Sequence, residues 1–262
     1  MTTPHSSPER SVVDRTLSIL AAFDRDNRTL SLSDISRRCG LPVATVYRIV
    51  NKLHAWGALE RSAEGGYSIG LRLWETASLA PRASYVVDAA HPHLLTLHRR
   101  TSAVTMIAIR DGSESVCLAA VGDDGPHQSL CGEGEGRRLP LHASAVGLIL
   151  LAHAGETTQR EALARPLRAY TPATVTDVGE LRRSLVRVRR EGHALIHGTF
   201  VPGLSSHAVP VRDVRGSVVA AVGVIGPPQR VRPAVTPHLH AAAAAITREL
   251  RTDGLARTGT GA

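Results

Sequence analysis

Two short helical patterns separated by a turn restrict the fold of this chain more than any other feature of its sequence. Ser31 and Asp34 have the spacing of a capping box, so we expect a helix to begin there. Gly40 is expected to end it, because glycine readily takes the left-handed conformation that closes helices. Pro42 suits the first turn of a second helix, which Gly57 would end. The apolar side of this second helix is formed by Val46, Ile49, Val50 and Leu53. Two helices joined by so short a turn predict a helix-turn-helix.

The flanking segments extend this motif to a winged helix-turn-helix. Ser11 and Asp14 form another capping-box pattern, which predicts a helix before the motif, with Val13, Leu17, Leu20 and Ala21 on its apolar side. After the motif, residues 58–62 and 67–69 have the composition of two short strands around a glycine-rich turn. Three helices followed by a hairpin are the layout of a winged helix-turn-helix. The alternative is a small helical subdomain whose polar side is only solvated.

The exposed side of the motif's second helix is the candidate DNA-reading surface, because the major groove of DNA admits a helix. Arg48 can recognise guanine with two hydrogen bonds, and Thr45 would contact a base or a phosphate. Lys52, and Arg61 in the hairpin, are expected to contact phosphates. The full set of candidate DNA-binding residues is Ser33, Val43, Ala44, Thr45, Tyr47, Arg48, Asn51, Lys52 and Arg61.

The charge of the chain gives modest support for a nucleic-acid partner. The formal net charge is +8, which fits a polyanion. Residues 1–80 contribute only +2 of this charge, however, and the remainder of the chain contributes +6. The basic excess is therefore not concentrated in the motif.

The remainder of the chain alternates helical and strand-like patterns. Strands are expected near residues 104–110, 115–121, 193–199, 205–212 and 217–225, and helices near 85–100, 143–152, 177–191 and 233–250. The turn dipeptides Asp111-Gly112 and Arg215-Gly216 join neighbouring strands, which predicts antiparallel pairing. The expected fold class is α+β, with a winged helix-turn-helix followed by a sensor domain built on an antiparallel sheet.

Pro81 interrupts a helical pattern, and we place the domain boundary near it. Residues 122–138 are expected to form a glycine-rich polar loop. The expected division is a disordered N-terminus at 1–10, a DNA-binding domain at 11–70, a linker helix at 71–84, the sensor domain at 85–251 and a disordered tail at 252–262.

Four segments of the sequence resemble the IclR family of bacterial transcriptional regulators. GLPVATVYRIVNKL resembles the family's turn and recognition helix, and GALERSAEGGYSIG resembles its wing. In the C-terminal half, LPLHASAVGLILLA resembles the family's sheet-to-helix segment, and PGLSSHAVPVRDVRGSVVAAVGVIGP resembles its closing strands. The likeness implies sequence-specific DNA binding that a small organic effector modulates by occupying a GAF-like domain. It also implies a homodimer, or a dimer of dimers, on a palindromic double-stranded DNA operator, with the sign of regulation left open.

The resemblance places an effector pocket between the start of the LPLHASAVG helix and strands near Ser206 and Gly223. The free amide groups of a helix N-terminus suit a carboxylate. Relatives that bind small oxo-acids have polar groups where this chain has Ile196, Gly223 and Ile225. We therefore expect an effector with an apolar body, the alternative being a pocket that no longer binds a ligand. The candidate effector-binding residues are Leu139, Leu141, Ala145, Val146, Ile196, Ser206, Gly223 and Ile225.

Catalysis and metal binding have less support in the sequence. Serine and histidine adjoin at Ser206 and His207, but adjacency in sequence does not make a nucleophile and its base meet in space. The histidines do not follow a standard zinc spacing. We expect no catalytic residues, no metal and no cofactor. A small-molecule-binding enzyme with a vestigial helix-turn-helix is the alternative from another class.

The cysteines and the hydropathy indicate where the protein acts. Cys39, Cys117 and Cys131 form no C-x-x-C pair, which indicates a reducing compartment. The sequence has no apolar run long enough to span a membrane and no signal peptide at its start. A cytoplasmic protein without a membrane partner is expected.

Overall fold

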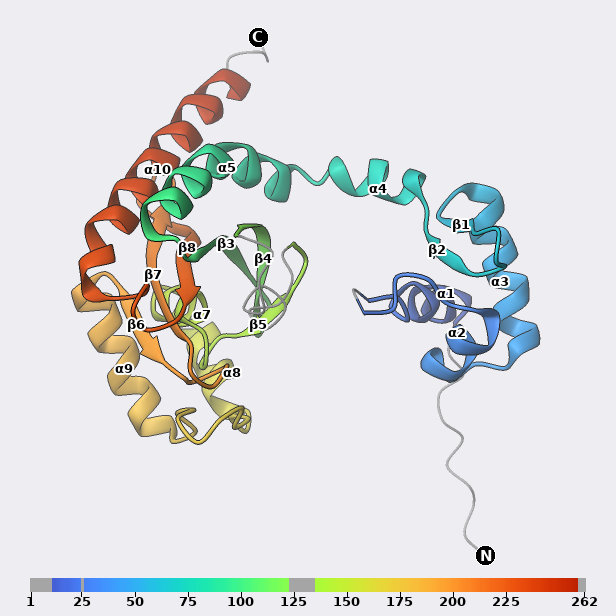
Figure 1. Ribbon diagram of the computed structural model, residues 1–262, viewed down its shortest axis with the longest axis horizontal. Helices are drawn as coiled ribbons and strands as arrows, with labels where there is room; N and C mark the ends of the chain where they lie inside the picture. The colour runs from blue at the N-terminus through green and yellow to red at the C-terminus, as the bar shows by residue number, and fades with distance from the viewer. Residues whose placement is uncertain (1–10, 25, 123–134, 259–262) are drawn as a thin grey trace, which may run out of the picture. The chain divides into compact units, whose positions relative to one another are not determined.

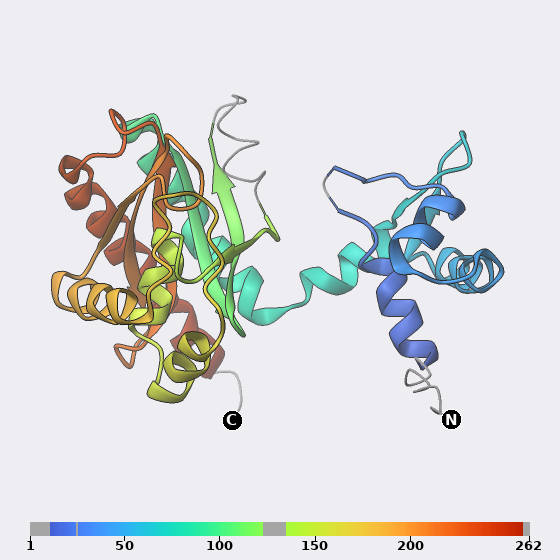
Figure 2. The ribbon, with the colours of Figure 1, turned by 90° about the horizontal axis from the view of Figure 1, so that it is seen from below.

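The computed structural model describes residues 11–24, 26–122 and 135–258, with the side chains of 81, 82 and 252–258 left aside (Figures 1 and 2). The chain divides into two compact units after Pro81. Each unit has its own buried apolar core, as expected for segments that fold around separate hydrophobic centres.

The N-terminal unit combines helices with a short antiparallel hairpin. Its elements are α1 (Val12–Leu20), α2 (Leu32–Cys39), α3 (Val43–Trp56), β1 (Leu59–Arg61), β2 (Tyr67–Ile69) and α4 (Leu71–Ser78). Leu59 pairs with Ile69, and Arg61 pairs with Tyr67. Leu30 bridges to Tyr67, so the segment before α2 lies against the hairpin. The predicted order of three helices and a hairpin is confirmed.

The predicted helix ends are present as capping interactions. The hydroxyls of Ser11 and Ser31 accept hydrogen bonds from the amides of Asp14 and Asp34, and the two aspartate side chains complete capping boxes. Gly40 ends α2 in the left-handed conformation, with φ of 67°. The sequence therefore fixes the length of α2 at both ends.

One predicted apolar stripe is wrong. Val13 and Leu17 were expected to face the core from α1, but their side chains are 65% and 57% exposed. Ile19 and Ala22 are buried instead. The helix is thus rotated relative to the predicted stripe, and α1 offers an apolar side to the exterior.

The expected linker helix at 71–84 is divided between two helices. α4 ends at Ser78, and α5 (Pro81–Thr101) begins at the proline that we expected only to interrupt the pattern. Proline lacks the amide hydrogen that the first helical position leaves unpaired in any case, so it can begin a helix. Residues 81–84 therefore belong to the long helix α5 and not to a separate linker helix.

The C-terminal unit is built on one antiparallel sheet in the order β5-β4-β3-β8-β7-β6. Its strands are β3 (Val104–Asp111), β4 (Glu114–Val121), β5 (Arg138–Pro140), β6 (Ala194–His197), β7 (Ser205–Arg212) and β8 (Val218–Gly226). Its remaining helices are α7 (Ala145–Ala152), α8 (Glu156–Ala164), α9 (Val178–Glu191), the 3-10 turn η1 (Pro233–Val235) and α10 (Thr236–Thr258).

Helices cover both sides of this sheet. α5 and α10 cover one side and lie alongside each other (Figure 1), joined by hydrogen bonds from the Tyr85 hydroxyl to the Leu250 carbonyl and between His93 and Glu249. α7 and α9 cover the other side. Because strand side chains alternate between the two sides, Ser206 and Ala208 face α7 while His207 and Val209 face α10.

Some segments differ from the sequence-based expectation. β5 begins at Arg138, the last residue of the stretch expected to be a loop, and residues 123–134 of that stretch fall outside the described chain. α8 was not predicted. The expected disordered tail is wrong for residues 252–258, through which α10 continues. Residues 1–10 and 259–262, also expected to be disordered, lie outside the described chain.

Candidate functional site

The first candidate site is the exposed side of α3. Val46 and Val50 are fully buried and hold this helix against the core of the N-terminal unit. Arg48 and Lys52, on the opposite side of the helix, are exposed. A helix anchored in this way presents one polar side to a binding partner, as a recognition helix must.

The predicted DNA-binding residues are brought to the surface of this unit. Ser33, Val43, Ala44, Tyr47, Arg48, Lys52 and Arg61 are exposed, and Thr45 and Asn51 are partly buried. Val43 and Tyr47 are 49% and 54% exposed, unusually high for large apolar side chains on a short helix. This exposure follows from their place on the polar side of α3.

Some arginines near α3 form ion pairs within the N-terminal unit, whereas other basic residues remain available to bind DNA. Arg37 pairs with Asp34 at 2.6 Å, and Arg38 pairs with Asp24. The Ser31 hydroxyl, which donates to Asp34, is the main cause that lowers the pKa of that carboxyl group. Within the described chain, Arg48 and Lys52 form no ion pair or side-chain hydrogen bond. Their charges are therefore available to a polyanion.

The hairpin after α3 is held close to the rest of the unit. The Arg61 guanidinium lies over the Tyr67 ring, 5.9 Å from its centroid. A Cβ atom at Gly66 would lie 2.5 Å from Cγ2 of Thr29, so only glycine fits this turn without a shift. The hairpin thus positions Arg61 firmly while this residue remains exposed, as a phosphate contact requires.

Sequence reasoning missed a contact that fixes the end of α3. The Arg72 guanidinium lies over the Trp56 ring at 4.6 Å and donates to the Trp56 carbonyl. Arg72 therefore joins the C-terminus of α3 to α4, where a cation also complements the helix dipole. No periodicity in the sequence signals this pairing.

The second candidate site is a cavity in the C-terminal unit, between the start of α7 and the central strands. Its lining residues are Met106, Leu139, Ser144, Ala145, Val146, Phe200, Ser206, His207, Gly223, Val224 and Ile225. The cavity has a volume of about 30 Å³, roughly the space of one water molecule. A ligand the size of an aromatic ring would therefore require the lining side chains to move.

The start of α7 is fixed by a capping serine. The Ser144 hydroxyl donates to the Pro140 carbonyl at 2.7 Å and accepts from the Gly147 amide at 3.1 Å. A Cβ at Gly147 would lie 2.6 Å from the Pro140 oxygen, so glycine allows this close approach. Every residue of α7 is buried. Ser144, Ala145 and Val146 at the start of α7 thus line the cavity from a rigid position, and a helix leaves the amides of its first turn without partners within the helix.

The sheet contributes a row of side chains across three strands. Ile196, Ser206 and Ile225 are paired neighbours on β6, β7 and β8. The Ser206 hydroxyl forms no hydrogen bond with any residue in the described part of the chain. It is flanked on both sides by isoleucine, so one polar group stands in an otherwise apolar wall.

Gly223 lies where β8, β7 and α7 approach one another. A Cβ at this position would lie 3.1 Å from Cγ1 of Val146 and 3.1 Å from the His207 carbonyl. The absence of a side chain at Gly223 therefore permits close packing of the helix on the sheet.

The cavity includes six of the eight predicted effector-binding residues and omits two. Leu141 lines a separate hollow with His142 and Tyr170, and Ile196 lies in the adjoining apolar core. Sequence reasoning missed the other five lining residues, which are Met106, Ser144, Phe200, His207 and Val224. Phe200 comes from an irregular segment without periodicity, so no pattern predicted its position.

Arg137 lies next to Phe200, the aromatic residue that lines the cavity. The Arg137 guanidinium is 5.8 Å from the centroid of the Phe200 ring, and the ring of Tyr170 meets Phe200 edge-on at 4.9 Å. Because Arg137 is only partly buried, its charge can remain hydrated while the neighbouring ring lines the cavity.

His207 also borders the cavity, but its buried side chain lies on the opposite side of the sheet, near Thr236. Its ring lies 5.1 Å from that of His193, and its Nε2 is 3.4 Å from the Thr236 hydroxyl. Burial, reinforced by the nearby His193, lowers the pKa of His207 to about 4. The imidazole is therefore neutral near pH 7 and belongs to the core of the domain.

Comparison with known families decides what the two units are. The family model described as the IclR helix-turn-helix domain matches residues 12–63. The model described as the bacterial transcriptional regulator IclR C-terminal domain matches residues 82–251. The chain belongs to the IclR family. It is a DNA-binding transcriptional regulator, with the predicted α+β fold of a winged helix-turn-helix and a GAF-like domain on an antiparallel sheet.

Characterised IclR-family proteins are similar over most of the chain. It is 31% identical to the HTH-type transcriptional regulator XynR of Escherichia coli K12, over 81% of this chain and 84% of that protein. It is 30% identical to the HTH-type transcriptional repressor AllR of Salmonella typhi, over 87% of this chain and 84% of that protein.

Solved structures agree with this assignment. An IclR homologue from Microbacterium hydrocarbonoxydans, crystallised with 4-hydroxybenzoate, is 33% identical and superposes with a TM-score of 0.85. The match covers 92% of this chain and all of that one. The Thermotoga maritima IclR structure superposes with a TM-score of 0.72 at 26% identity, over 91% of this chain and 98% of that one.

Two further observations concern other kinds of site. Among the described residues, no helix is long and apolar enough to cross a membrane. The same residues bring together no group of three or more histidine, cysteine, aspartate or glutamate side chains suited to a metal ion.

Proposed function

We propose that this regulator reads its operator with the exposed side of α3, and that a small organic acid with an apolar body changes its operator affinity by binding at the start of α7. The observation that carries the first part is the burial of Val46 and Val50 opposite Arg48 and Lys52, which are exposed and form no ion pair with any described residue. One side of α3 packs against the core of the N-terminal unit, so the other side is available to bind DNA.

Within this proposal, the exposed residues of α3 have distinct roles. Arg48 donates two hydrogen bonds to a guanine, and Val43 and Ala44 near the start of the helix contact thymine methyl groups. Lys52 on α3 and Arg61 in the hairpin bind phosphates and set the register. Ser33, Thr45, Tyr47 and Asn51 complete the contact surface. Two phosphate contacts and one base-reading helix fit a winged helix-turn-helix half-site.

The effector class follows from the lining of the cavity. Its walls include Met106, Leu139 and Ile225, and the two serines that line it are Ser144, at the start of α7, and Ser206. An apolar body would fill the walls, while a carboxylate would accept hydrogen bonds from the helix amides. The relative crystallised with 4-hydroxybenzoate supports an aromatic acid for this chain as well.

The assembly belongs to the same proposal. α1, α4 and the residue that follows α4 expose large apolar side chains, namely Val12, Val13, Leu17, Leu71, Trp74 and Leu79, each more than half exposed. Such exposure on two helices of one small unit marks a protein interface. We infer that the N-terminal units form a homodimer, which binds a palindromic operator; a dimer of dimers would extend this assembly.

The test measures operator binding and effector binding on the same protein. Fluorescence anisotropy with DNA flanking the gene gives the operator affinity, with and without 4-hydroxybenzoate, octanoate, pyruvate or glyoxylate. We expect one of the larger acids to raise the melting temperature and change operator affinity, because a ligand stabilises the state that it binds. Tightest binding of pyruvate or glyoxylate would contradict the effector class, and absence of sequence-selective DNA binding would contradict the regulator.

A further inference from the structure

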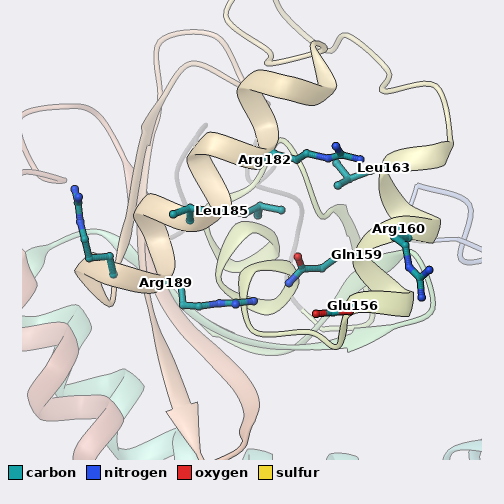
Figure 3. A pocket seen from close by; sticks show the side chains of 9 residues that line it. Glu156, Gln159, Arg160, Leu163, Arg182, Leu185 and Arg189 are labelled. Atoms are coloured by element: carbon teal, nitrogen blue, oxygen red, sulfur yellow. The ribbon is translucent and has the colours of Figure 1, made fainter.

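A groove lies between α8 and α9 of the C-terminal unit, formed by residues distinct from those lining the cavity at α7 (Figure 3). Its volume is about 590 Å³. Figure 3 shows Arg182 extending from α9 toward Leu163 on α8, with Gln159 and Arg189 pointing toward the space between the helices. The lining residues are Glu156, Gln159, Arg160, Leu163, Arg182, Leu185, Val186, Arg189 and Arg190.

The rim of the groove is strongly basic. Arg160, Arg182, Arg189 and Arg190 are opposed by the single carboxylate of Glu156. Arg189 donates to the Ala152 carbonyl and so has a structural role at the end of α7. Arg182 forms no ion pair or hydrogen bond within the described chain, and Arg190 reaches only the exposed Glu191, at 3.4 Å. The groove therefore has positive charge that the protein itself leaves largely uncompensated.

Apolar side chains lie among these arginines. Leu185 is buried beneath the groove, Leu163 is partly buried on α8, and Val186 is 70% exposed on α9. Val186 stands four residues from both Arg182 and Arg190, so all three share one side of the helix. An exposed valine flanked by arginines suits an occupant with both apolar and acidic groups.

We propose that this groove binds an acidic amphipathic helix of another protein. Charge complementarity selects an acidic occupant, because the rim has four guanidinium groups and one carboxylate. The apolar floor selects a helix with leucine-like residues on one side, which is how helices bind in grooves between other helices. α8 and α9, with 9 and 14 residues, provide a wall of two to four turns for such a partner.

Other occupants match the groove less well. A nucleic-acid backbone would use the arginines but would gain nothing from Val186 and Leu163. A second copy of this chain is disfavoured by its net charge of +8. An acidic helix uses both the rim and the floor.

The test uses the full-length protein and a synthetic probe. The probe is a fluorescein-labelled amphipathic helix of about 15 residues, with leucine at positions i, i+3, i+4 and i+7 and glutamate elsewhere. The control probe has lysine in place of glutamate. We expect saturable binding of the glutamate probe, measured by fluorescence anisotropy, and at least roughly tenfold weaker binding of the lysine probe, because the basic rim repels it.

A matched pair of double variants locates the binding site. The R182E/R190E variant changes two groove arginines, whereas R183E/R187E makes the same charge change on α9 at two positions that do not line the groove. We expect R182E/R190E to weaken binding of the glutamate probe at least roughly tenfold and R183E/R187E less than about threefold. Val186→Ser should weaken it as well, because a purely ionic contact would not depend on this side chain.

Several outcomes would overturn the proposal. If the two double variants weaken binding of the glutamate probe equally, the attraction is non-specific. If Val186→Ser leaves the affinity of the probe unchanged, the apolar side chains do not contribute to binding. Displacement of the probe by a duplex of unrelated sequence, with the same sensitivity to R182E/R190E, would assign the groove to DNA. The absence of saturable binding by wild-type protein would reject the groove as a helix-binding site. Circular dichroism melting of each variant confirms that it is folded.

Discussion

At the scale of single residues, Arg48 is the side chain of α3 best suited to read a base. It is exposed and unpaired within the described chain, and the helix beneath it is held by Val46 and Val50. Arg48→Ala should cost about 1–3 kcal/mol of specific binding and relax the preference at one operator position. Thermal stability should hardly change, because no contact within the described chain is lost. A selection from randomised operator sites measures the preference, and an unchanged preference would remove Arg48 from the reading residues.

Lys52 is the matched control for that prediction, because it lies on the same side of α3, four residues further along. A phosphate contact carries no sequence information. Lys52→Ala should therefore weaken binding to all sequences by a similar factor, and should reduce the slope of log affinity against log salt by about one. A change of base preference in this variant, with an unaltered salt slope, would reverse the two assignments.

The buried His207 predicts how the stability of the C-terminal unit depends on pH. Its pKa is lowered to about 4 in the folded protein, mainly by burial and then by His193, whereas an unfolded histidine titrates near 6.5. The unfolded chain therefore binds more protons between these values, and folding stability decreases as the pH falls from about 6.5 to about 4. The full loss from this group would be about 3 kcal/mol.

The test of His207 compares slopes of stability against pH. Urea unfolding between pH 7 and pH 4.5 should give a flatter dependence for His207→Asn than for the wild type, whatever the absolute stability of the variant. His238→Asn, on α10, controls for the removal of a histidine. Identical slopes for the wild type and His207→Asn would show that this group does not titrate as inferred.

At the scale of helices and strands, sequence patterns were most informative where a capping residue fixed an element's end. α2 is capped by Ser31 and Gly40 as predicted, because capping and the left-handed conformation are local effects. The unpredicted α8 has only partly buried apolar residues, and β5 is three residues long, so neither has a clear periodicity. In α1 the predicted apolar residues Val13 and Leu17 do lie on one helix, but their side chains face the exterior instead of the core.

The candidate cavity shows the same division between local and tertiary information. The start of α7 and the row through Ser206 and Ile225 were predictable, because they are regular elements. Phe200 also lines the cavity, although it comes from an irregular segment. Leu141, which was predicted to line the cavity, lines a separate hollow instead, because the chain turns at Ser144 to begin α7. Such turns depend on contacts between distant segments, which sequence spacing does not record.

The contact of α7 with the sheet makes Gly223 a test of effector binding. A side chain at this position would press against Val146 and the His207 carbonyl, each of which would lie 3.1 Å from its Cβ atom. Gly223→Ala should narrow the cavity and weaken binding of an aromatic acid at least roughly tenfold, since the neighbouring backbone cannot yield easily. Calorimetry measures the affinity. Operator affinity without effector should be unchanged, and equal effector binding in variant and wild type would place the effector elsewhere.

At the scale of the whole molecule, the two units divide the work of the regulator. The N-terminal unit has the recognition helix, and the C-terminal unit has the buried cavity and the basic groove. The latter unit also has most of the net positive charge, +6 of the total +8, counted from residue 81 onward. Charge alone would therefore have pointed to the wrong half of the chain as the DNA-binding unit, whereas the helix-turn-helix pattern identified the right one.

Dimer formation through the N-terminal units is the prediction that concerns the assembly. Leu17 on α1 and Trp74 on α4 are 57% and 64% exposed, so they contribute little to the core of one chain. Leu17→Glu and Trp74→Glu should therefore leave melting of the unit nearly unchanged while placing a charge in the interface. Val214→Glu, at a residue 56% exposed in the other unit, adds the same charge as a control. Light scattering should show dissociation only for the first two variants.

The consequence for DNA binding follows from symmetry. One short recognition helix specifies few bases, and a symmetric dimer reads an imperfect palindrome with half-site centres about 10 bp or a multiple apart. Linking two half-site contacts raises the apparent affinity by roughly 100-fold or more, so the dissociated variants should lose this factor on the palindrome. Their affinity for an isolated half-site should be unchanged. Wild-type protein that is monomeric at micromolar concentration, and that binds one half-site as tightly as the palindrome, would contradict the dimer.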